Sequence, residues 1–214
     1  MRLVFIHGWG FDPHFWDVLA AALARFPQTR VDLGFFGGAV DRVRDDEPAI
    51  LIGHSLGFLH GMRARKNWAG WVAINSFPRF VATPTEAGCV SAASLRAMRG
   101  GLLKDAPKTL ADFYRLIGAA APAAAVTPHV ESLRDGLDVL RDASFDPAVV
   151  AGTGLVLAAK NDPLVPIATS AALAASADRI AWHAGGGHLL PQNATAWCAE
   201  QIVGFVDDAQ GRAP

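Results

Sequence analysis

One serine in the sequence lies between two glycines, in a pattern that is typical of a catalytic nucleophile. Ser55 stands in the stretch ILIGHSLGF, with Gly53 and Gly57 two positions away on either side. The apolar residues before Gly53 favour a buried strand, and the residues after Ser55 favour a helix. A G-x-S-x-G sequence at such a junction forms a sharp turn that exposes the serine hydroxyl. The stretch therefore predicts a nucleophile, and an ordinary strand-to-helix turn that contains a serine is the alternative.

The two glycines that flank Ser55 would prevent steric clashes in this turn. A serine on so tight a turn takes up an unfavourable backbone geometry, which active sites tolerate. Gly53 and Gly57 would remove the Cβ atoms that collide across the turn. The helix that follows would also point its first N–H groups at negative charge developing near Ser55.

A nucleophilic serine needs a base, and His188 is the strongest candidate among seven histidines. Enzymes that carry the serine on such a turn place the acid and then the histidine later in the chain. His188 follows three glycines in GGGHLLP, directly after the last predicted strand. A loop histidine without a catalytic role is the alternative. The other histidines precede or adjoin the serine, lie in the helical region, or lie inside a strand: His7, His14, His54, His60, His129 and His183.

The acid that orients this base is predicted to be Asp162. It lies in KNDPLVP, after the apolar run Leu155–Ala159. An Asx turn is the alternative, because Asn-Asp-Pro is also a good turn sequence. Asp146 and Asp178 are weaker rivals, since both precede predicted strands and would lie at the opposite edge of the sheet.

Two backbone N–H groups are predicted to stabilise the oxyanion that forms when an ester carbonyl is attacked. One belongs to Leu56, directly after the nucleophile. The other belongs to Trp9, in the turn His7-Gly8-Trp9-Gly10 that follows the first strand. A His-Gly turn with a purely structural purpose is the alternative.

Strands and helices alternate along almost the whole chain. This order predicts an α/β fold with a mostly parallel, doubly wound sheet. The predicted strands are Leu3–Ile6, Thr29–Asp32, Ala49–Ile52, Gly70–Ile74, Leu155–Ala159 and Arg179–His183. The predicted helices outside the lid segment are Asp12–Arg25, Leu56–Lys66, Ile167–Ala175 and Thr195–Val206.

Residues 76–147, called the lid segment below, interrupt this alternation. They contain no convincing strand, but three helix-like pieces at Ser94–Leu103, Pro107–Ile117 and His129–Leu140. Because ligands bind outside the carboxyl ends of parallel strands, an insertion after the fourth strand would cover the site. We therefore expect a helical lid within one domain that spans residues 1–214.

Composition narrows the function classes further. The 214 residues are 51% hydrophobic and 18% charged, with a formal net charge of -1. Such a chain suits one globular domain and gives no basic surface for nucleic acid. Cys89 and Cys198 cannot form a disulfide framework, and no metal or organic cofactor is implied. The first apolar run is too short for a signal or a membrane span. We expect a cytoplasmic monomer without membrane contact.

Over nearly its whole length the chain resembles the α/β-hydrolase superfamily, through HGWG, GHSLG, KNDPLVP and GGGH in that order. More closely, it resembles the pimeloyl-acyl-carrier-protein methyl ester esterases of biotin synthesis. HGWG, INSFPRF at Ile74–Phe80 and LRDGLDVL at Leu133–Leu140 carry this closer resemblance. It implies hydrolysis of the methyl ester of pimeloyl-acyl carrier protein through a Ser-His-Asp triad and an acyl-enzyme.

The chain also departs from that family's pattern. We expect no counterpart of that family's usual N-terminal hairpin, because the first predicted strand is already the one that leads to HGWG. Only a short polar segment separates Asp32 from the strand at Ala49, where a full helix is usual. Phe58 stands where a small residue is more common, and it would narrow the pocket behind the serine.

Two groups of residues are candidate contacts to the substrate and its carrier. Expected to bind substrate are Trp9, Phe58, Phe77, Phe80, Phe113 and Ile117. Expected to contact an acidic carrier protein are Arg96, Arg99, Lys108 and Arg115. The alternatives are the lid's own packing for the first group and a solvated helical face for the second. Two other functions stay open: a general short-chain carboxylesterase or thioesterase, and a non-catalytic binding protein of the same fold.

Overall fold

Six strands form one sheet in which all neighbouring strands run parallel, as the sequence predicts. The computed structural model describes residues 1–37, 40–120, 127–145 and 153–211. The sheet order is β2-β1-β3-β4-β5-β6. The strands are β1 (Arg2–Ile6), β2 (Gln28–Val31), β3 (Ala49–His54), β4 (Gly70–Ile74), β5 (Thr153–Ala159) and β6 (Arg179–His183).

The central strands are apolar because helices cover both faces of the sheet. Every residue of β3 and β4 is buried, and so are the last four residues of β1. Continuous apolar runs of this kind are typical of parallel strands buried on both sides. At the edge of the sheet, β6 is only partly buried and keeps polar residues at its two ends.

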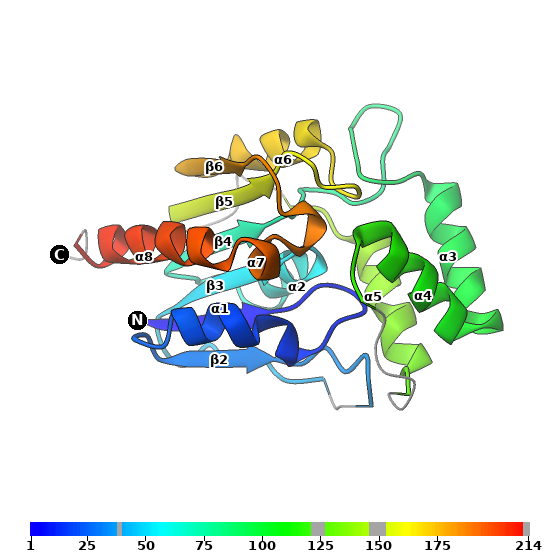
Figure 1. Ribbon diagram of the computed structural model, residues 1–214, viewed down its shortest axis with the longest axis horizontal. Coiled ribbons are helices and arrows are strands. Elements are labelled where there is room, and N and C mark those ends of the chain that lie inside the picture. Colours follow the sequence, from blue (N-terminus) through cyan, green and yellow to red (C-terminus); the bar gives the residue numbers. More distant parts are fainter. Residues whose placement is uncertain (38–39, 121–126, 146–152, 212–214) are drawn as a thin grey trace.

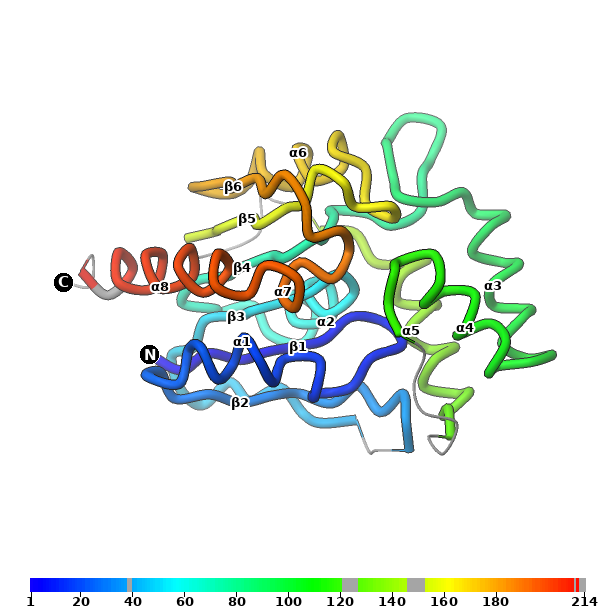
Figure 2. The backbone as a smooth tube through the Cα atoms, viewed as in Figure 1, coloured from blue at the N-terminus to red at the C-terminus, as the bar shows by residue number. Residues whose placement is uncertain are grey.

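Helices pack on both faces of this sheet (Figure 1). The helix α1 (Asp17–Ala22) packs against α8 (Thr195–Gly211) on one face, and α2 (Leu56–Ala64) lies on the opposite face. Two further helices, α6 (Ile167–Ala174) and α7 (Leu190–Asn193), follow β5 and β6. In Figure 2 the C-terminal end of α8 and the start of β1 lie on the same side of the view.

The strand order reverses between β1 and β3. The chain moves outward from β1 to β2 and then returns to the other side of β1 to form β3. Ligands of parallel α/β sheets bind at the carboxyl ends of the strands next to such a reversal. The last residue of β1, Ile6, is paired with Gly53 of β3, so the turn after β1 and Ser55 emerge side by side.

Between β4 and β5 the described residues form three helices, called the lid helices below, which gather at the carboxyl end of the sheet (Figure 1). They are α3 (Ala92–Lys104), α4 (Ala106–Ile117) and α5 (Val130–Asp142), close to the predicted ranges. Asp105 begins α4 by accepting a hydrogen bond from the Lys108 N–H, and Gly118 ends it at a φ of 71°. The described part of the lid segment contains only two isolated bridges besides these helices. Residues 121–126 and 146–147 of this segment, including Asp146, lie outside the described residues.

Two predicted segments differ from the structure. The helix predicted from Asp12 to Arg25 is split into a 3-10 turn, η1 (Pro13–Trp16), and α1, which ends at Ala22. The expected N-cap is present, because the Asp12 carboxylate accepts a hydrogen bond from the His14 N–H at 2.8 Å. The loop predicted around His188 instead forms a 3-10 turn, η3 (Gly187–Leu189), followed at once by α7.

Within the described residues, no helix is both long and apolar enough to cross a membrane. The same residues contain no group of three or more histidine, cysteine or carboxylate side chains that could hold a metal ion.

Candidate active site

Ser55 has the strained backbone that the G-x-S-x-G pattern predicts. It lies at φ 51° and ψ -121°, and among the described residues only Asn75 is another non-glycine with positive φ. Such a conformation costs of order 1–3 kcal/mol and persists where neighbours hold it in place. The Ser55 N–H donates to Ile74 O at 3.1 Å, and its carbonyl accepts from the Ser76 hydroxyl at 2.8 Å. The end of β4 thus holds the strained turn.

The flanking glycines are required by close backbone contacts. A Cβ on Gly57 would lie 2.0 Å from the carbonyl oxygen of Ile6, and one on Gly53 would lie 2.4 Å from the Cα of Phe58. Both distances are far below any real contact of a Cβ atom. The first turn of α2 can therefore lie against the end of β1 only because these side chains are missing.

His188 and Asp162 form the pair that the sequence predicts. The His188 Nδ1 lies 2.8 Å from the Asp162 Oδ2, and both side chains are 1% exposed. The other carboxylate oxygen of Asp162 accepts the N–H groups of Leu164 and Val165 at 2.8 and 3.0 Å. Because a carboxylate only accepts hydrogen bonds, Nδ1 of His188 must carry the proton. Its Nε2 is then free to accept one, as a general base must.

A buried asparagine and a buried histidine hold the segment that carries His188. The His188 carbonyl accepts from His54 Nε2 at 2.9 Å and from Asn75 Nδ2 at 3.1 Å. Asn75 also donates to Gly187 O at 2.7 Å and accepts the Ala159 N–H at 2.9 Å. The ends of β3, β4 and β5 are thereby connected to the candidate base. The role of Asn75 does not follow from the sequence, since neither its positive φ nor its distant partners leave a local pattern.

His54 is therefore part of the scaffold of the site. Its ring is fully buried and stacks on Phe15 with the ring centroids 4.5 Å apart. Burial holds the pKa of His54 well below its ordinary value, since a charged imidazole would lose its hydration there. The neutral ring carries its proton on Nε2, which donates to His188, and its Nδ1 has no partner among the described residues.

The turn after β1 is fixed by lid helices as well as by the sheet. The indole N–H of Trp9 donates to Leu133 O in α5 at 2.7 Å. The hydroxyl of Tyr114 in α4 donates to Gly10 O. In the described parts of the chain, neither the Trp9 nor the Leu56 backbone N–H donates to a protein acceptor. The two predicted oxyanion donors thus remain available for a ligand.

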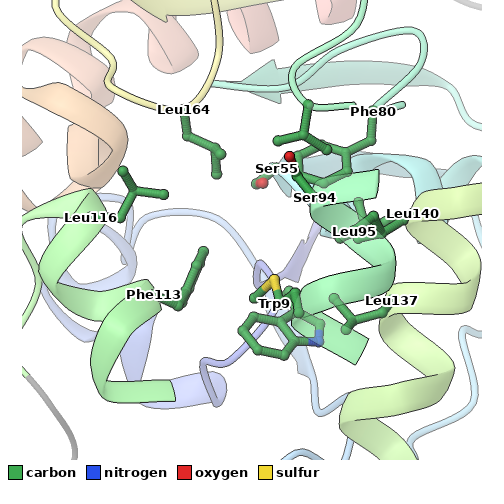
Figure 3. A pocket seen from close by; sticks show the side chains of 12 residues that line it. Trp9, Ser55, Phe80, Ser94, Leu95, Phe113, Leu116, Leu137, Leu140 and Leu164 are labelled. Atoms are coloured by element: carbon green, nitrogen blue, oxygen red, sulfur yellow. The ribbon is translucent and has the colours of Figure 1, made fainter. Parts of the chain in front are cut away.

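A cavity of about 210 Å³, called the inner cavity below, opens above Ser55 (Figure 3). Apart from two serines its described lining is apolar, and it includes three of the predicted substrate contacts, Trp9, Phe80 and Phe113. The full lining is Trp9, Ser55, Phe80, Val90, Ser94, Leu95, Met98, Phe113, Leu116, Leu137, Leu140 and Leu164.

Three other predicted substrate contacts do not line this cavity. Phe58 points into the core of the domain, where its ring packs 5.3 Å from Trp71 and 5.2 Å from Phe145. It therefore does not narrow the inner cavity. Phe77 is fully buried behind Phe80, and Ile117 is buried at the end of α4. An apolar residue in or beside the lid thus need not face the substrate.

The four basic residues predicted to meet a carrier protein are on the lid helices, and three of them have partners within the lid. Arg99 pairs with Asp138 at 3.0 Å, while Lys108 and Arg115 pair with Asp112 at 2.6 and 2.7 Å. Arg96 is exposed on α3. Such surface pairs contribute little to stability, but they reduce the net positive charge of this face.

The sheet order, the turn at Ser55 and the helices inserted after β4 define the α/β-hydrolase fold. A bromoperoxidase from Bacillus anthracis is similar over 96% of this chain and 91% of its own, with 16% identity and a TM-score of 0.79. An esterase from Exiguobacterium antarcticum matches over 97% and 92%, with 14% identity and a TM-score of 0.78. An enol-lactonase from Burkholderia xenovorans matches over 96% and 91%, with 16% identity and a TM-score of 0.74. No protein-family model and no curated protein sequence matches the chain.

Proposed function

We propose that the chain is a serine carboxylesterase. One observation carries this proposal: a strained, nearly buried serine and a histidine held by a buried carboxylate emerge at the same edge of the sheet, and the serine lines an apolar cavity. Strain of this kind has no structural benefit of its own, and it is characteristic of functional sites. The esterase and the enol-lactonase among the structural neighbours have names that agree with ester chemistry.

In the proposed reaction, the Ser55 Oγ attacks the carbonyl carbon of the ester while its proton passes to His188 Nε2. Asp162 keeps the imidazole in the required tautomer and stabilises its positive charge. The N–H groups of Trp9 and Leu56 bind the oxyanion, at typically about 3 kcal/mol per donor. The alcohol leaves with the proton from His188, and water then hydrolyses the acyl-enzyme by the same steps.

Within this class, the proposed substrate is the methyl ester of pimeloyl-acyl carrier protein, as the resemblance implies. The apolar inner cavity suits the methylene chain of a pimeloyl group. The basic residues of the lid helices, Arg96 in particular, would attract an acidic carrier protein.

A general short-chain carboxylesterase or thioesterase is the second candidate, and one observation favours it. Three of the four basic residues expected to contact a carrier are already paired with carboxylates of the lid helices, with Lys108 and Arg115 sharing Asp112. An esterase that acts on free esters needs no positive face.

Two variants test the esterase proposal itself. Ser55→Ala should abolish hydrolysis of p-nitrophenyl butyrate and labelling by a fluorophosphonate, and thermal unfolding should show that the fold remains. Ser170→Ala is the control, because Ser170 is equally buried but lies in α6. Failure of the wild-type protein to react with the fluorophosphonate would instead indicate the non-catalytic binding protein.

A second experiment separates the two substrates. We expect a higher kcat/KM for methyl pimelate on acyl carrier protein than for free dimethyl pimelate, and rescue of a biotin auxotroph that lacks its own methyl esterase. Equal rates on both esters, without rescue, would favour the general esterase.

A further inference from the structure

Three side chains form a boundary between the inner cavity and a second hollow on the outer surface of the lid helices. This outer groove has a volume of about 500 Å³ and is formed by α3 and α4. Met98, Phe113 and Leu116 line both the inner cavity and the outer groove. These residues, called the wall below, therefore stand between Ser55 and solvent on this side.

We propose that the wall sets the length of the acyl chain that the inner cavity accepts, and that the preferred substrates are esters of linear, uncharged, medium-chain acids. This inference rests on the proposed esterase function, because it places the acyl group of the ester above Ser55. It goes beyond that function by naming the substrate class and the residues that limit it.

The lining of the inner cavity determines the polarity of this chain. Its described residues include no charged side chain, and its two hydroxyls belong to Ser55 and Ser94. A charged group within the chain would lose its hydration there without a partner, which is costly. An uncharged hydrocarbon chain instead exchanges water contact for contact with leucine and aromatic side chains.

The volume of the inner cavity determines the length. About 210 Å³ corresponds to roughly seven molecules at the ~30 Å³ that a water occupies in the liquid. A methylene group is close to a water molecule in size, so roughly six to eight carbons fill the space. A longer chain must displace the wall or remain in water.

Of the residues that line the inner cavity, those of the wall have the most freedom to move. Leu116 is 53% exposed, and Met98 and Phe113 are only partly buried. In contrast, Leu137 and Leu140 on α5 are almost fully buried. In Figure 3, Phe113 and Leu116 project from α4 into the inner cavity, across from Leu137 and Leu140 of α5. Met98 adds the flexible thioether chain that adapts most readily to different shapes.

Beyond the wall the surroundings become polar. Lys104, Lys108, Asp105 and Asp112 border the outer groove. A chain that passes between α3 and α4 would therefore move from an apolar lining to a charged rim. Each methylene group beyond the wall should then contribute less binding free energy than one inside the cavity. The binding free energy, followed as a function of the number of acyl carbons, should therefore change slope at the chain length that reaches the wall. This change of slope is called the break below.

The test uses chain-length series in the wild-type protein and in two wall variants. On p-nitrophenyl esters from acetate to palmitate, the wild-type kcat/KM should be highest at roughly six to eight carbons. Leu116→Ala combined with Met98→Ala should raise the ratio of dodecanoate to hexanoate kcat/KM on the order of tenfold, since the added room accepts further methylenes. Leu116→Trp should lower the ratio of octanoate to acetate by a similar factor. Leu103→Ala is the matched control, because Leu103 is 63% exposed on α3 and lines neither hollow.

A binding series keeps this test independent of catalysis. In the Ser55→Ala background, calorimetry with methyl hexanoate, octanoate and dodecanoate should show the same break. The break should move to longer chains when Leu116→Ala and Met98→Ala are added, and to shorter chains when Leu116→Trp is added. If the wild-type protein hydrolyses no ester but the break moves with the wall, the esterase function is wrong and the wall assignment stands. If activity is present but Leu116→Ala with Met98→Ala gives the same chain-length profile as Leu103→Ala, the wall assignment is overturned.

Discussion

The strain at Ser55 can be measured by comparing glycine and alanine at two serines. The backbone of Ser55, at φ 51° and ψ -121°, lies outside the regions that residues with a Cβ favour. Glycine adopts such angles far more easily. Ser55→Ala keeps the strain, whereas Ser55→Gly releases about 1–3 kcal/mol of it. Glycine also makes the unfolded chain more flexible and removes a buried Cβ, and both effects oppose the gain.

Ser170 allows these opposing effects to be subtracted. It is as buried as Ser55, at 2% against 6% exposed, but it lies within the regular helix α6. There glycine should be about 1 kcal/mol less stable than alanine. The glycine-minus-alanine difference in unfolding free energy should therefore be about 1–3 kcal/mol more favourable at Ser55 than at Ser170.

Thermal unfolding of the four variants provides the measurement. In a domain of this size, about 1 kcal/mol shifts Tm by about 2–4 °C, so the two differences should be separated by at least about 2 °C. Urea unfolding at room temperature would give the same comparison as free energies. If glycine costs as much at Ser55 as at Ser170, the turn stores no strain and the reasoning is refuted.

Three further predictions concern the acid, the turn and the buried histidine. Asp162→Asn should lower kcat roughly 10³–10⁴-fold with little change in Tm, because an amide no longer selects the tautomer with the proton on Nδ1; steady-state kinetics with unchanged stability checks this. Gly57→Ala should destabilise the fold by about 3 kcal/mol or more in urea unfolding, because its Cβ would overlap backbone that cannot move aside. Gly204→Ala in α8, where a Cβ meets nothing within 4 Å, should instead stabilise the fold by about 0.5–1 kcal/mol. The pKa of His54 is lowered in the folded state, so the unfolded chain binds more protons below the ordinary histidine pKa. Stability should therefore fall as the pH falls through that range, by on the order of 1 kcal/mol per pH unit. His54→Gln, which keeps a donor for the same carbonyl, should flatten that slope, and an unchanged slope would show that His54 is not its origin.

Much of the fold follows from local sequence patterns. The predicted bounds of the strands agree with the structure within one or two residues, because buried parallel strands have continuous apolar runs in their sequence. The lid helices are found equally well from their amphipathic spacing. The split between η1 and α1 is missed, since the same apolar spacing fits a 3-10 turn followed by a short α-helix.

The candidate site divides in a similar way. Ser55, Asp162 and His188 can be named from the sequence because each follows an identifiable strand at the same edge of the sheet. Asn75 and Tyr114 cannot, because their partners lie 113 and 104 residues away and are met only through the fold. Phe58 shows the opposite error: three residues after Ser55, the helix has turned its side chain toward the core.

The close approach of Gly57 to Ile6 shows which positions of this molecule can accept substitutions and which cannot. Because a single carbon on Gly57 would overlap the carbonyl of Ile6, the serine turn and the strand before the oxyanion turn behave as one rigid body. Most random substitutions in the serine turn or at the end of β1 should therefore prevent folding. Residues of α3 and α4 that face the inner cavity meet no such backbone limit. Directed evolution toward new esters should therefore accumulate its changes on the lid helices and leave the sheet edge as it is.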